Sequence, residues 1–157
     1  LFLTGVNVGF SPLGYVLGDE GSGAVLGRNL VNGIFKGHIP LKEEFLAAHG
    51  LNYEEIIRRV YREGMANRFL ASFTRFVARH IDRPELDELV CKAFRAFVRR
   101  NLAHYPADAE VSALGGVACH FERQLRHVLA TEGMRAGRIV ETPDEGLLNY
   151  HIWNRSE

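Results

Sequence analysis

The chain has 157 residues, of which 46% are hydrophobic and 24% are charged, and these proportions are ordinary for one globular domain. Its 19 basic residues equal its 19 acidic residues, which argues against a dedicated nucleic-acid binder or a polybasic membrane binder. Two cysteines are too few for a disulfide scaffold, and no apolar run approaches the roughly 20 residues of a membrane span, so we expect a cytoplasmic domain.

The N-terminal segment is apolar and rich in glycine. It opens at Leu1 with LFLTGVNVGF and no initiating methionine, which is typical of a strand entered partway and favours a fragment of a larger protein. Residues 11–15, SPLGY, combine proline and glycine as turns and loops do.

Apolar positions at helical spacing then predict a helix from about Gly21 to Lys36. Asp19 or Glu20 would lie near its N-terminus, where the helix dipole favours a carboxylate. Three small residues in its first turn would let another backbone or a ligand approach closely: Gly21, Gly23 and Ala24.

Residues 41–104 form an expected helical block. A short helix over 41–49 should end at Gly50, and Asn52 is a candidate N-cap for the next helix. An apolar stripe over 69–77 predicts a further helix, and another begins near Pro84.

The pattern changes to alternating strands and helices after Pro106. We expect a strand over 111–114, then Gly115 and Gly116, and then a helix to about Thr131. A second short strand over 138–140 and a helical segment over 145–151 complete the chain. This order predicts an α/β fold with a largely parallel sheet, to which the helical block is added.

The segment GDEGSG, residues 18–23, is the first candidate for chemistry. Glycine-rich backbone before a helix can bind an anion, although the lysine of a Walker A loop is missing. The adjacent carboxylates of Asp19 and Glu20 could instead bind sugar hydroxyls or lie near a magnesium ion. A plain helix cap with acidic residues in the first turn is the competing interpretation.

Gly115 and Gly116 are the second candidate, since they let the backbone approach a flat or phosphate-bearing ligand, but a tight turn without a ligand is as common.

Residues 12–31, PLGYVLGDEGSGAVLGRNLV, resemble the C-terminal half of N-acetylglucosamine kinase-like proteins of the BadF/BadG/BcrA/BcrD ATPase family. The resemblance continues over 56–81, over 111–129 and in the closing ETPDEGLLNYH, and so covers nearly the whole chain. These proteins belong to the actin-like ATPase superfamily of sugar kinases. The resemblance implies one ribonuclease H-like lobe of a two-lobed enzyme, with residues 1–157 as the C-terminal lobe and the N-terminal lobe absent.

The resemblance also implies ligands and partners. The whole enzyme would transfer a phosphoryl group from ATP, with Mg²⁺, to a hydroxyl of an amino sugar such as N-acetylglucosamine. The catalytic base belongs to the missing lobe, so no catalytic residue is assigned here and the chain alone should be inactive. Asp19 or Glu20 could replace that base only as a minor alternative, and a homodimer is a further expectation.

Site residues follow by matching motifs. Asp19 matches a sugar-hydroxyl contact, and Gly14 lies in the loop that lines the sugar site. Thr4 and Gly5 fall where the family has a phosphate loop, although Leu3 and Val6 depart from it. Two residues match the adenosine motif: Gly115 and Gly116.

Two other functions compete with the kinase. One is a non-catalytic module that senses a sugar or nucleotide or pairs with another chain, and the departures at Leu3 and Val6 favour it. The other is an ATPase that activates a second protein. Iron–sulfur activases of that kind need clustered thiolates, whereas Cys91 and Cys119 are expected to be buried structural thiols.

Overall fold

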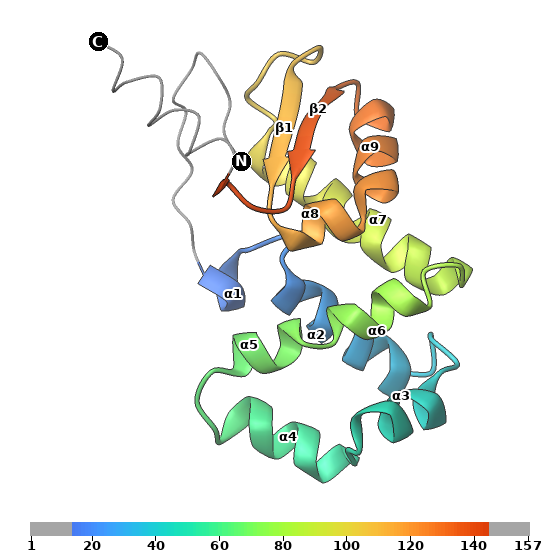
Figure 1. Ribbon diagram of the computed structural model, residues 1–157. Coiled ribbons are helices and arrows are strands. Elements are labelled where there is room, and N and C mark those ends of the chain that lie inside the picture. The colour runs from blue at the N-terminus through green and yellow to red at the C-terminus, as the bar shows by residue number, and fades with distance from the viewer. Residues whose placement is uncertain (1–13, 145–157) are drawn as a thin grey trace. The chain divides into compact units, whose positions relative to one another are not determined.

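The computed structural model describes residues 14–144, apart from the side chain of Tyr15. These residues divide into two compact units, one ending at His104 and the other beginning at Tyr105 (Figure 1). The strand expected at the N-terminus and the helical segment expected over 145–151 lie outside the described residues. Within the described range, no helix is both long and apolar enough to cross a bilayer.

The described part of the first unit contains seven helices and no strand. They are α1 (Gly14–Leu17), α2 (Gly23–Phe35), α3 (Lys42–His49), α4 (Tyr53–Tyr61), α5 (Ala66–Ala71), α6 (Thr74–Arg79) and α7 (Pro84–Asn101). Helix α2 packs against α5, α6 and α7, and α4 packs against α5. Leu26 and Leu30 of α2 are fully buried, as the apolar spacing of this helix predicts.

Helix α2 begins two residues later than the sequence suggested. Ser22 is its N-cap, and the side-chain oxygen accepts a hydrogen bond of 3.3 Å from the backbone N–H of Val25. Its first turn holds no acidic residue, so Asp19 and Glu20 lie just before the helix, near its N-terminus as expected, and not within it. A Cβ at Gly23 would lie 3.2 Å from that of Ala71, so this glycine makes room for a neighbouring helix.

An aromatic cluster forms the centre of the helical core. The ring of Phe45 meets those of Phe73 and Phe76 edge-on, with centroids 4.9 and 5.4 Å apart, and all three are buried. The ring of His49 lies 4.9 Å from Phe73 and shares the cluster. His80 stacks on Phe76 and pairs with Glu44 at 2.8 Å, which connects α6 to α3.

The single helix expected over 69–77 is instead two helices, α5 and α6. The hydroxyl of Ser72 donates to the carbonyl of Phe69 at 2.7 Å, and that of Thr74 donates to Ala71 at 2.8 Å. Such local hydrogen bonds compete with the helical pattern. The break directs Phe73 into the core while both helices keep their apolar faces inward.

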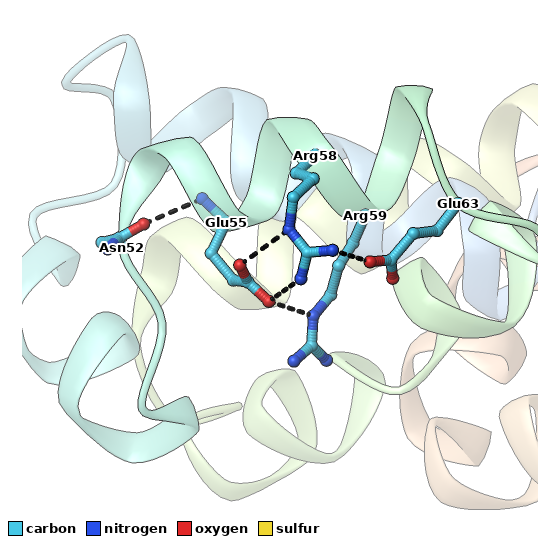
Figure 2. Close-up of polar contacts among 5 residues, drawn as sticks. All are labelled: Asn52, Glu55, Arg58, Arg59 and Glu63. Carbon is cyan, nitrogen blue, oxygen red and sulfur yellow. Dashed lines mark hydrogen bonds and ion pairs between the residues drawn. The ribbon is translucent and has the colours of Figure 1, made fainter.

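Helix α4 carries a network of ion pairs on its exposed surface (Figure 2). Asn52 caps the helix, as expected, because its side chain accepts a hydrogen bond of 2.8 Å from the N–H of Glu55. The carboxylate of Glu55 accepts two hydrogen bonds from Arg58, at 2.7 and 3.1 Å, and one of 2.8 Å from Arg59. Arg58 also pairs with Glu63, so the network joins the helix to the turn after it.

We expect the Glu55 carboxyl to titrate far below the usual value of a glutamate. Hydrogen bonds from Arg58, and then from Arg59, lower the pKa of Glu55 to about 2. A lowered folded-state pKa means that this contribution to stability is present above the usual value of 4.5 and is lost as the pH falls toward 2. NMR titration of the side-chain carboxyl carbons measures this directly, and a Glu55 midpoint near 4.5 would show that the network does not form in solution.

The described part of the second unit is a β-α-β arrangement. Strands β1 (Glu110–Leu114) and β2 (Arg135–Val140) are parallel neighbours, which confirms the predicted parallel pairing (Figure 1). Helices α8 (Gly116–His120) and α9 (Glu122–Thr131) connect them, and both contact β2. The core of this unit is made mainly of buried apolar side chains: Val111, Phe121, Leu125, Val128 and Leu129.

The helix expected to run to Thr131 is interrupted at Phe121. The backbone of this residue leaves the helical region, with φ −113° and ψ 33°, and its side chain is buried. The residues on either side of this break, from His120 back and from Glu122 on, therefore lie on different helices, α8 and α9. The structure thus has a mixed α/β architecture with a small parallel sheet and many helices.

Candidate functional site

The GDEGSG segment forms a turn between α1 and α2. Asp19 adopts a left-handed backbone with φ 58°, which is uncommon for a residue with a side chain but better tolerated by aspartate than by most. Its carbonyl accepts a hydrogen bond of 2.9 Å from the N–H of Ser22, the N-cap of α2. On the other side, Gly18 donates to the carbonyl of Gly14 at 2.8 Å. The turn is therefore held by backbone hydrogen bonds at both ends.

Gly14 itself has φ 71° and opens α1 as a helical turn, where the sequence suggested a loop through residue 15. A Cβ at this position would meet none of the described residues within 4 Å. The left-handed backbone, not crowding by those residues, is what favours glycine here.

The two carboxylates of the turn have different surroundings. Glu20 accepts a hydrogen bond of 2.7 Å from the guanidinium of Arg100 and one of 3.3 Å from the amide of Asn101, both near the end of α7. Its side chain is only 15% exposed. The hydrogen bond from Arg100 contributes most to lowering the pKa of Glu20. Glu20 is thus an ionised anchor of the turn, and a poor candidate for a catalytic base.

The carboxylate of Asp19 is exposed, and it forms no hydrogen bond or ion pair with any residue that the structure describes. A carboxylate that is held in place by its backbone but has no partner can accept hydrogen bonds from two hydroxyl groups at once. Of the acidic pair, Asp19 is therefore the residue that could bind a ligand.

Arg100 is a functional neighbour that the sequence did not reveal. Its side chain lies near the end of α7 and is 70% exposed. Its partner, however, lies 80 residues earlier in the chain. No local spacing connects two such positions, so only the fold brings them together.

We expect Glu20 and Arg100 to be coupled when both are changed. Glu20→Ala and Arg100→Ala should each lower stability modestly, and a double-mutant cycle should give a coupling of about 0.5–1 kcal/mol, since one partner is exposed. Urea unfolding of the four proteins measures the coupling, and 0.5 M salt should reduce it by screening. A coupling of zero at low salt would mean that the pair does not hold the turn.

The second candidate site follows strand β1. Gly115 has φ 126° and ψ 156°, a conformation that side chains rarely adopt, and its N–H donates to the carbonyl of Val140 at 2.9 Å. Among residues 14–144, a Cβ added to Gly115 would meet nothing within 4 Å, and one at Gly116 would meet only the Glu141 carboxylate at 3.9 Å. As far as these residues go, the space beside the glycine backbone would accommodate a flat ligand.

The structure places the expected site residues as follows. Gly14 and Asp19 belong to one turn of the first unit, and Gly115 and Gly116 belong to the second unit. Thr4 and Gly5 lie outside the described residues. Among residues 14–144, no group of three or more His, Cys, Asp or Glu side chains could hold a metal ion. Cys91 is buried, Cys119 is half-buried, and both are free thiols.

No family model and no curated protein matches the chain. Among solved structures, the chain is similar to a protein of Porphyromonas gingivalis named "putative N-acetylglucosamine kinase", with 43% sequence identity and a TM-score of 0.89. The match covers 93% of this chain and 53% of that protein, so the chain spans about half of its length. The resemblance expected from the sequence is confirmed.

Proposed function

We propose that this chain is the nucleotide- and sugar-binding C-terminal lobe of an ATP-dependent amino-sugar kinase, with N-acetylglucosamine or a close relative as the substrate. The observation that carries the proposal is the structural and sequence similarity to the Porphyromonas gingivalis protein over nearly the whole chain. The ribonuclease H-like classification, the cytoplasmic location and the N-terminal lobe as partner are parts of the same proposal.

The sugar would be bound at the Asp19 turn. The Asp19 carboxylate accepts hydrogen bonds from sugar hydroxyls, and the open backbone at Gly14 borders the same ligand. Glu20 holds the turn through Arg100 and Asn101, so that Asp19 keeps one orientation before the ligand arrives. Such preorganisation reduces the entropic cost of binding.

The nucleotide would lie along Gly115 and Gly116, where a side chain would fill the space that the ligand needs. The hydrogen bond from Gly115 to Val140 fixes this backbone in advance. Mg²⁺, bound with ATP, supplies charge neutralisation for the phosphates in reactions of this class. The chain's own residues bind and orient the two substrates, and the base that accepts the hydroxyl proton belongs to the other lobe.

A chimera tests this function. The half of the Porphyromonas gingivalis protein that matches this chain is replaced by residues 1–157, and ADP formation is measured with Mg-ATP, with and without N-acetylglucosamine. We expect sugar-dependent ADP formation by the chimera, none by the chain alone, and much less at the same sugar concentration by the chimera with Asp19→Ala.

Two outcomes would contradict the proposal. A folded chimera that binds N-acetylglucosamine but shows no nucleotide binding in calorimetry would support a sugar sensor. A folded chimera that binds neither ligand would indicate that the chain is an interaction module that pairs with another chain. Circular dichroism and gel filtration establish that the chimera is folded before either conclusion is drawn.

A further inference from the structure

A groove of about 610 Å³ lies in the helical unit, and neither candidate site explains it. Its walls come from α1, α2 and α4, and Leu70 of α5 also lines it. Ile56 and Leu70, which line it, are apolar and only 2% and 5% exposed. Pockets that hold small ligands commonly measure about 300–1,000 Å³ and are lined mainly by apolar side chains.

Exposed apolar side chains gather at this groove. Seven large hydrophobic residues are exposed among those that the structure describes, and four of them line the groove: Val16, Tyr53, Ile57 and Tyr61. Tyr61 is 78% exposed and Val16 is 65% exposed. Such a concentration of exposed apolar surface is typical of a binding surface, whereas single exposed residues are not.

One wall of the groove is positively charged. Arg28, Asn32 and Lys36 follow one another at intervals of four residues along α2, which places them on one helix face. Both cations are exposed, and neither has an ion pair among the described residues. No aspartate or glutamate is among the described residues that line the groove. An anionic group beside Asn32 would lie within a Debye length of both cations.

We propose that this groove binds a single-chain amphiphilic anion. Its aliphatic or aromatic body lies against Ile56, Ile57 and Leu70, and its carboxylate or phosphate group lies beside Asn32 between Arg28 and Lys36. Apolar burial supplies most of the affinity, while the two cations select against neutral and cationic amphiphiles.

Decanoate is a suitable probe, with decanol and decyltrimethylammonium as neutral and cationic counterparts of the same chain length. Calorimetry and NMR shift mapping on the 157-residue chain should give one decanoate site at the groove. We expect binding about tenfold tighter than that of decanol, since one charge-assisted contact is worth roughly that factor, and weakest binding for the cation. The measurement uses neither sugar nor nucleotide, so its result is independent of the proposed kinase function.

Two variants separate charge from apolar contact. Arg28→Gln with Lys36→Gln should remove the preference for decanoate over decanol. Arg75→Gln with Arg79→Gln removes the same charge from exposed positions of α6 and should change nothing. Ile57→Asp should abolish binding of decanoate and decanol alike, and Ile57→Ala, a milder change, should weaken both if the aspartate variant does not fold.

Three results would overturn the proposal. The first is equal affinity for decanoate, decanol and decyltrimethylammonium. The second is a preference for decanoate that both double variants retain. The third is a dimer in sedimentation velocity that decanoate leaves intact and Ile57→Asp dissociates, which would identify a second copy of the chain as the occupant.

Discussion

Gly27→Ala is expected to destabilise the helical unit by about 3 kcal/mol, at the upper end of the usual range for overpacking. Gly27 is buried in α2, and a Cβ there would lie 1.9 Å from the backbone carbonyl oxygen of Leu70 in α5. Backbone cannot rotate away as a side chain can, so α2 and α5 must separate. Alanine favours helices more than glycine by about 1 kcal/mol, which offsets only part of this cost.

Two other glycines provide graded controls for that experiment. A Cβ at Gly33 would lie 2.6 Å from the terminal Cδ1 of Ile39, which can rotate, so Gly33→Ala should cost less. A Cβ at Gly64 would meet nothing within 4 Å, and Gly64→Ala should be nearly neutral. Urea unfolding followed by circular dichroism ranks the three variants, and equal effects at Gly27 and Gly64 would mean that the close α2–α5 contact is absent in solution.

Most helices of the first unit could be predicted from periodicity because each buries one apolar face. Gly50 and Asn52 also marked the end of α3 and the start of α4 correctly, because a left-handed C-cap and an N-cap side chain form hydrogen bonds with backbone groups only a few residues away. The break between α5 and α6 could not be predicted from periodicity because the apolar stripe continues across it. The hydroxyls of Ser72 and Thr74 donate to carbonyls of α5 at this break, and neither residue interrupts that stripe.

The candidate site could be located from the sequence, but the sequence did not show which of its two carboxylates would be free to bind a ligand. Asp19 and Glu20 are adjacent and chemically alike, and their difference comes from Arg100 and Asn101, about 80 residues away. The close approach of α2 and α5 at Gly27 was hidden for a similar reason. The reason for a glycine within a helix becomes visible only when the helix that packs against it is known.

The proposed function predicts a large loss of sugar affinity when Asp19 is replaced. Asp19→Gly should weaken N-acetylglucosamine binding to the chimera roughly a hundredfold, because two charge-assisted hydrogen bonds are lost. The same variant should fold at least as stably as the parent, since glycine adopts φ 58° without strain. Calorimetric titration with the sugar and urea unfolding measure the two effects on the same protein.

Asp19→Asn and Asp82→Ala complete the test. Asparagine tolerates the left-handed backbone and keeps one acceptor oxygen, so its loss of affinity should be intermediate. Asp82→Ala removes an exposed carboxylate elsewhere in the same unit and should leave sugar affinity unchanged. Asp19→Gly is expected to change sugar affinity without lowering stability. A stable Asp19→Gly chimera that binds the sugar as tightly as the parent would therefore show that Asp19 is not part of the sugar site. A loss of affinity confined to Asp19 variants would place the sugar at a turn that Glu20 and Arg100 hold in position.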